Sequence, residues 1–116
     1  MKIAIPTQGA LLCPHFGHCE EFTIVTVDPA TKQIVETERI PAPAHEPGLL
    51  PRWLHEKGAD IIIAGGVGGR ARDLFAQNGV GVFVGAPIAS PSEIVNAYLD
   101  GTLASGANPC DHGPCE

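Results

Sequence analysis

The sequence predicts a single α/β domain in which a mixed sheet of five strands is flanked by helices. The chain has 116 residues, of which 44% are hydrophobic, and this is enough for one core. Short continuous apolar runs at 2–6, 60–64 and 80–84 are typical of strands buried on both faces. Segments with helical spacing alternate with the last two runs, which implies parallel strands joined by helices.

A hairpin is predicted after the loop that follows the first strand. Residues 21–28 are rich in β-branched and aromatic types, and a turn that contains Pro29 leads back into a second strand at 33–40. This second strand carries several charged residues, among them Arg39. Charges along a strand are typical of a sheet edge, so residues 33–40 are expected there.

Three helices are predicted from apolar spacing and end signals. The apolar residues are Leu49, Leu50, Trp53 and Leu54 in the first helix, and Ala71, Leu74 and Phe75 in the second. Gly58 and Gly79 follow these helices as stop signals. The third helix, at 91–100, begins with proline after a capping box of Ser90 and Glu93.

The domain is expected to cover residues 1–101, with residues 102–116 as a polar tail that bears Cys and His. The first residues look like a strand and not a signal peptide, and no run approaches the roughly 20 apolar residues of a membrane span. A cytoplasmic protein is therefore expected. The formal net charge of −6 and only seven scattered Lys and Arg argue against nucleic acid or an anionic membrane as a partner.

The loop after the first strand concentrates metal-binding residue types. Its candidate ligands are Cys13, His15, His18 and Cys19. Thiolate and imidazole suit zinc, copper and iron–sulfur centres. A chain of this size in the cytoplasm does not need disulfides, so paired cysteines favour a metal site over an incidental polar loop.

The tail holds a second cluster of ligand types, Cys110, His112 and Cys115. The spacing is not the C-x-x-C of zinc ribbons or redox sites, so the tail is expected either to complete a site begun by Cys13 and Cys19 or to be a frayed end. Completion within one chain or across two subunits through a shared cluster both remain open. His45, in the connector before the first helix, is a weaker candidate ligand.

A glycine-rich segment connects the strand at 60–64 to the second helix. Its candidate cofactor-binding residues are Gly65, Gly66, Gly68, Gly69 and Arg70. A loose G-x-G-x-x-A pattern raises dinucleotide binding, but Gly85 stands where the expected acidic residue should follow the next strand. Backbone N–H groups at a helix start also bind anions, and metal–sulfide clusters are usually anionic. Tight strand–helix packing is the simpler alternative.

Topology predicts that these features meet. Parallel strands place the loop that begins at Cys13 and the glycine segment at the same edge of the sheet, where ligands of open α/β sheets bind. The leading interpretation is a carrier or assembly protein for a metal–sulfur cluster, not an enzyme. A mononuclear zinc or copper protein, and a small thiol enzyme using a Cys–His pair, are the alternatives.

Several motifs occur in the order typical of one family. They are Met1-Lys2-Ile3-Ala4-Ile5-Pro6, His15-Phe16-Gly17 followed by Phe22, His45 with Gly48, the stretch from Asp60 to Arg70, and Leu99-Asp100-Gly101-Thr102-Leu103. On these residues the chain resembles the dinitrogenase iron–molybdenum cofactor biosynthesis family of small NifX-like and NifB C-terminal-like proteins.

The resemblance implies a ribonuclease H-like fold without a nuclease site. It also implies binding or carriage of an iron–sulfur cluster or an iron–molybdenum-type cluster, and a related protein holds a mixed molybdenum–copper sulfide cluster. The family's histidine loop corresponds to His15 and its glycine segment to Gly65–Gly69. The extra cysteines of this chain favour a cluster ligated directly by thiolates. A client metalloenzyme or a cluster donor is the implied protein partner.

Overall fold

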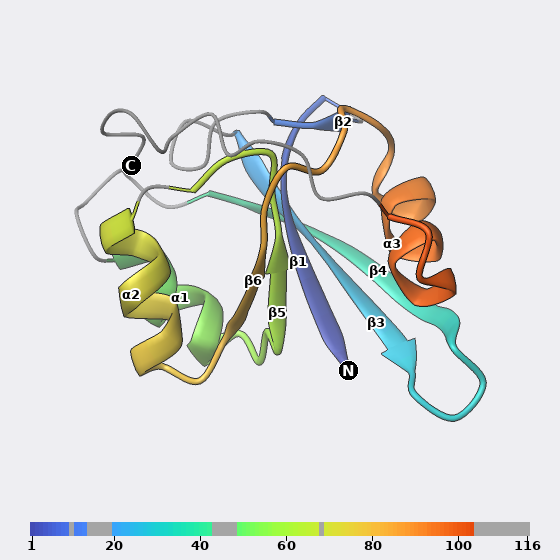
Figure 1. Ribbon diagram of the computed structural model, residues 1–116, viewed down its shortest axis with the longest axis horizontal. Helices are drawn as coiled ribbons and strands as arrows, with labels where there is room; N and C mark the ends of the chain where they lie inside the picture. Colours follow the sequence, from blue (N-terminus) through green and yellow to red (C-terminus); the bar gives the residue numbers. More distant parts are fainter. Residues whose placement is uncertain (10, 14–19, 43–48, 68, 104–116) are drawn as a thin grey trace.

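The computed structural model describes residues 1–9, 11–13, 20–42, 49–67 and 69–103 (Figure 1). The elements are β1 Lys2–Gln8, β2 Leu11–Leu12, β3 Glu21–Asp28, β4 Gln33–Pro41, α1 Leu49–Glu56, β5 Ile61–Ile63, α2 Gly69–Gln77, β6 Gly81–Phe83 and α3 Pro91–Asp100. The predicted order is confirmed. The addition is β2, which at two residues is too short to show an alternating pattern in the sequence.

The strands of the described residues form one mixed sheet. Its order is β4-β3-β1-β5-β6, and β2 pairs with β1 outside this path. β1 is antiparallel to β2 and β3, and β3 is antiparallel to β4. The pairs β1–β5 and β5–β6 are parallel. The predicted parallel strands and the predicted edge position of residues 33–40 are therefore both confirmed.

Helices cover both faces of the sheet, with α1 and α2 on one side and α3 on the other (Figure 1). On the first face Phe22, Leu54 and Phe75 belong to one buried cluster. On the second face Ile5 and Ile94 belong to another. Because the central strands contribute side chains to both clusters, they read as continuous apolar runs in the sequence.

The third helix has the ends that the sequence predicts. The Ser90 hydroxyl accepts the Glu93 N–H at 3.3 Å, Pro91 occupies the first turn, and Gly101 follows in the left-handed conformation. None of the helices in the described part of the chain is long and apolar enough to cross a membrane.

Candidate functional site

The carboxyl ends of the parallel strands define the edge where a ligand is expected. β1, β5 and β6 run in the same direction, so the segments that follow them emerge together, opposite the N-terminus (Figure 1). These segments are the turn after β1 that leads to Cys13, the glycine segment after β5, and the connection from β6 to α3. The topology therefore confirms the prediction that these strand ends meet at one edge of the sheet.

Cys13 is held at this edge by backbone pairing. Its N–H donates to the Pro6 carbonyl at 2.8 Å, which continues the β1–β2 ladder by one residue. The N–H of the preceding Leu12 donates to the Ala89 carbonyl at 3.0 Å, just before α3 begins. Cys13 is only 3% exposed, and its Sγ lies 4.0 Å from Oε1 of Gln8. The thiol is therefore fixed by the sheet at its carboxyl edge, one residue after β2.

The remaining predicted metal ligands lie outside the described residues. They are His15, His18, Cys19, His45, Cys110, His112 and Cys115. Within the described ranges, no three His, Cys, Asp or Glu side chains are grouped so that they could hold a metal ion. The predicted ligand set therefore stays a prediction, with Cys13 as the member whose position is known.

The glycine segment after β5 divides into a buried and an exposed part. Gly65 and Gly66 are buried, and the Gly65 carbonyl accepts the Gly85 N–H at 2.9 Å. Gly69 begins α2, and it and Arg70 are exposed, whereas Gly68 lies outside the described residues. The first turn of α2 contains no acidic side chain. Of the described part of this segment, the residues exposed to solvent are therefore those at the start of α2, and the predicted binding of an anion there stays a prediction.

Strand register relates the cysteine to the glycine segment. Ile3 pairs with Ile61 and Ala4 with Ile62 across the parallel β1–β5 pair. Two residues further along each strand, this register sets Pro6 level with Ala64. Since Cys13 is bonded to Pro6 and Gly65 follows Ala64, both features belong to the same end of neighbouring strands.

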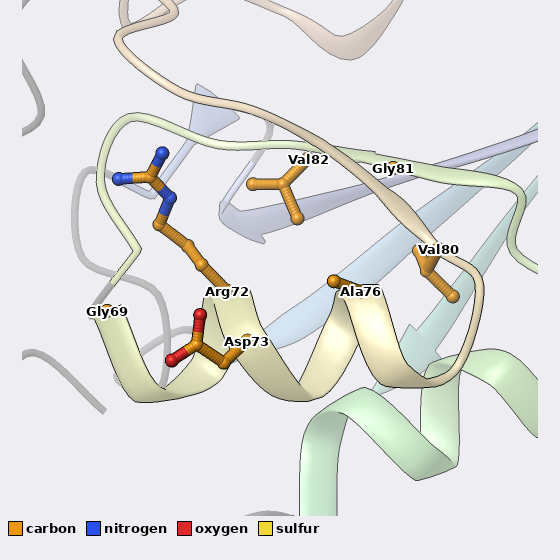
Figure 2. Close-up of a pocket in the computed structure, with 7 residues that line it drawn as sticks. All are labelled: Gly69, Arg72, Asp73, Ala76, Val80, Gly81 and Val82. Carbon is orange, nitrogen blue, oxygen red and sulfur yellow. The ribbon is translucent and has the colours of Figure 1, made fainter.

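A pocket of about 500 Å³ lies between α2 and the outer edge of β6 (Figure 2). Its lining residues are Gly69, Arg72, Asp73, Ala76, Val80, Gly81 and Val82. The Arg72 side chain extends toward the connection between β5 and α2, and the Asp73 carboxylate lies on the same side of the helix (Figure 2). The pocket starts beside Gly69 but extends along β6, away from the β1–β2 hairpin that carries Cys13.

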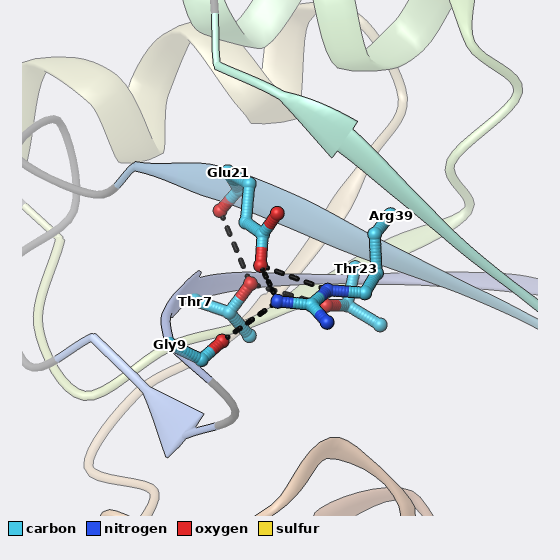
Figure 3. Close-up of polar contacts among 5 residues, drawn as sticks. All are labelled: Thr7, Gly9, Glu21, Thr23 and Arg39. Atoms are coloured by element: carbon cyan, nitrogen blue, oxygen red, sulfur yellow. Dashed lines mark hydrogen bonds and ion pairs between the residues drawn. The ribbon is translucent and has the colours of Figure 1, made fainter.

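A polar network lies on the α3 face of the sheet, next to the β1–β2 turn (Figure 3). The hydroxyls of Thr7 and Thr23 are 3.1 Å apart, and both residues are almost fully buried. The Thr7 hydroxyl also donates to the Glu21 carbonyl at 3.3 Å. Arg39 forms an ion pair with Glu21 and donates to the Gly9 carbonyl at 3.1 Å. This network was not predicted from the sequence.

The ion pair by itself contributes little to stability. The Arg39 side chain is 58% exposed and the Glu21 side chain 22% exposed. Both Nε, at 2.9 Å, and Nη2 of Arg39 donate to the same Glu21 oxygen, so the pair is not a two-oxygen fork. Exposed pairs of this kind contribute about 0–1 kcal/mol to stability. Arg39 therefore matters less for stability than for the two segments that it joins, the turn at Gly9 and the start of β3 at Glu21.

The described arrangement is that of a small α/β protein with an open mixed sheet, and in proteins of this class ligands commonly bind at the carboxyl ends of the strands. The chain belongs to the dinitrogenase iron-molybdenum cofactor family, whose sequence profile matches residues 1–101. The resemblance noted in the sequence is thereby confirmed. Membership implies a part in the binding or biosynthesis of the iron–molybdenum cofactor.

Similar proteins cover nearly the whole chain. The protein MJ0580 of Methanocaldococcus jannaschii is 34% identical over 107 residues, 89% of each chain. The crystal structure of the protein PH0822 has a TM-score of 0.82 at 28% identity and covers 90% of this chain and 94% of its own. The apo form of the orange protein from Desulfovibrio gigas has a TM-score of 0.71 at 25% identity, covering 93% and 94%. These likenesses confirm the predicted mixed α/β fold.

Proposed function

We propose that this chain binds a metal–sulfur cluster, either iron–sulfur or molybdenum-containing, and carries it or assists its assembly. The observation that carries the proposal is the position of Cys13. Its buried thiol is held at the carboxyl edge of the sheet, beside the glycine segment, in a chain of the dinitrogenase iron-molybdenum cofactor family. A thiolate at that edge suits a soft metal centre.

The proposed ligands combine the described cysteine with residues further along the chain. Cys13 and Cys19 are the proposed thiolates of the first loop, with His15, His18 and His45 as additional candidates. The cysteines and the histidine of the tail would complete the site, within one chain or across two subunits. Cutting the chain after residue 106 should then reduce both metal stoichiometry and cluster lifetime.

The start of α2 is proposed to support the cluster's charge. Gly69 presents exposed backbone, Arg70 is exposed and positive, and the first turn has no carboxylate to repel an anion. Backbone N–H groups that donate to cluster sulfurs would stabilise the anionic cluster and tune its potential. A cytoplasmic carrier of this kind would receive the cluster from a donor protein or deliver it to a client metalloenzyme.

Anaerobic reconstitution with iron and sulfide tests the proposal. The wild-type chain should take up iron with acid-labile sulfide and show thiolate-to-metal absorption, and a Cys13→Ser, Cys19→Ser variant should lose both. Ser92→Ala, an exposed change at the start of α3, serves as the control. Zinc or copper bound without sulfide would instead support a mononuclear metal protein. Undiminished cluster content in the double variant would contradict cysteine ligation.

A further inference from the structure

The described chain is anchored on both sides of the segment 14–19. On the preceding side, Leu12 and Cys13 donate their N–H groups to Ala89 and Pro6. On the following side, the Glu20 carbonyl accepts the Ala42 N–H at 3.0 Å, and the Glu21 carbonyl accepts the Thr7 hydroxyl. Two of the anchoring groups, Pro6 and Thr7, are neighbours on β1. Cys13 before the segment and Glu21 after it are thus bonded to the same part of the central strand.

The Arg39 side chain contacts both sides at once (Figure 3). It extends from the edge strand β4, and its Nη2 donates to the carbonyl of Gly9, in the turn before Cys13. The same guanidinium donates from Nε and Nη2 to the carboxylate of Glu21, after the segment. One planar group with several donors in a fixed geometry therefore sets the separation between the turn and β3.

Arg39 and the Cys13 thiol lie on opposite faces of the sheet. Arg39 is the register partner of Thr23, whose hydroxyl meets that of Thr7, so these three residues share the α3 face. Gln8 follows Thr7 along β1 and therefore points to the other face, where its side chain meets the Cys13 sulfur. Arg39 consequently acts on the thiol only through the backbone of the hairpin.

We infer that Arg39 is a positioning residue for Cys13. By bridging Gly9 and Glu21 it holds the β1–β2 hairpin against β3 and keeps the thiol in one place before any metal arrives. A pre-positioned ligand loses less conformational freedom on binding. The part of this inference that concerns cluster retention rests on the proposed function, whereas the part that concerns the thiol does not.

The first experiment measures the reactivity of the Cys13 thiol in the absence of metal. In a chain whose other cysteines are serine (Cys19→Ser, Cys110→Ser and Cys115→Ser), the reaction rate of Cys13 with iodoacetamide reports how often the hairpin opens. Arg39→Ala should raise this rate about three- to five-fold, the opening expected from the loss of one exposed polar clamp. Arg52→Ala removes an exposed arginine from α1 and should leave the rate unchanged.

The conservative variant separates bridging from charge. Lys keeps the positive charge but lacks the planar fork, so Arg39→Lys should remain close to Arg39→Ala in labelling rate. A wild-type rate in Arg39→Lys would overturn the bridging role. Glu21→Gln, which weakens the other end of the clamp and keeps the side-chain shape, should also raise the rate. It replaces Arg39→Ala as the test if thermal unfolding shows that the alanine variant is not folded.

The second experiment measures how fast the full chain, reconstituted with ferrous iron and sulfide, releases its iron. Arg39→Ala should release iron to a chelator about ten-fold faster than wild type, the size typical of residues that orient a ligand. Unchanged labelling in Arg39→Ala overturns the inference, and faster labelling with unchanged release overturns the part of it that concerns cluster retention. Faster labelling in a chain whose wild type takes up no cluster supports the positioning of Cys13 and contradicts the proposed function.

Discussion

The two ends of the parallel strands are built differently. At the amino ends, α1 and α2 each finish at a glycine of positive φ, Gly58 or Gly79, and the chain enters the next strand within two or three residues. There the Asp60 carboxylate accepts the Lys2 N–H at 2.8 Å and ties neighbouring strands together. At the carboxyl ends the connections are longer and carry Cys13 and the glycine segment.

The difference indicates a division of labour along the strands. The amino ends hold connections that only have to reverse the chain, so capping and packing decide their sequence. The carboxyl ends carry a buried thiol at Cys13 and an exposed helix start at Gly69, features that reversing the chain does not require. Changes at the amino ends should therefore alter stability, and changes at the carboxyl ends should alter the proposed cluster binding.

The largest expected effect is at Phe75, near the amino ends. This side chain is fully buried in the cluster under α1 and α2, and its carbonyl accepts the Val80 N–H at 2.9 Å. Phe75→Ala should lower the free energy of unfolding by about 3–5 kcal/mol, measured by urea denaturation, because it removes buried surface and leaves a cavity. Gln77→Ala, exposed on the same helix, should change it by less than about 0.5 kcal/mol.

Phe75→Ala should leave the proposed cluster site intact. At temperatures where the variant is still folded, the iron and sulfide bound per folded molecule should equal those of the wild type. A loss of bound cluster in proportion to the loss of stability would contradict the assignment of stability to the amino ends and of cluster binding to the carboxyl ends.

An intermediate effect is expected at Gly79, which ends α2. A Cβ added here meets no atom within 4 Å, so the only cost is the positive φ of 75°. Gly79→Ala should destabilise the fold by about 1–2 kcal/mol. Gly79→Asn should be milder because asparagine tolerates the left-handed region, and equal melting temperatures for the two variants would contradict a backbone origin.

The smallest effect on stability is expected at Gly69, at the other end of α2. An added Cβ again meets nothing within 4 Å, and no positive φ is required. Gly69→Ala should leave the free energy of unfolding within about 0.5 kcal/mol of wild type, or raise it slightly, since alanine favours helix. Cluster release should nevertheless be faster if the backbone at Gly69 approaches the cluster. Asn96→Ala on α3 is the matched exposed control.

Much of the fold was predictable because its local signals agree with its packing. Residues 21–28 form β3 as predicted, and the capping residues around α3 mark its limits. The strands in the apolar runs at 60–64 and 80–84 are shorter than predicted and cover Ile61–Ile63 and Gly81–Phe83. One backbone bond continues just beyond them, from the Ala64 N–H to the Phe83 carbonyl at 2.9 Å. The apolar runs predict which residues are buried, but they do not predict where regular pairing between the strands stops.

The site was only partly predictable. The place of Cys13 follows from the direction of the strands, which apolar runs indicate. The contact between Arg39 and Glu21 depends on a register shift between Thr26 and Val27 in the β3–β4 pair. Counting outward from the turn without this shift would pair Arg39 with Phe22 and turn its side chain to the wrong face. A single extra residue in one strand has no signature in the sequence, so the clamp was not visible there.

The same register shift and the charges of β4 have a consequence for the protein in concentrated solution. β4 is nine residues long, lies at the edge of the sheet and exposes Val35 to 67%. A long free edge invites a strand from another molecule to add to it, which is a route to aggregation. Glu36 and Glu38 place like charges where two such edges would meet, and the shift bends the strand out of a flat template. Without these two glutamates, the outer strand that anchors Arg39 would also become the strand that recruits further copies.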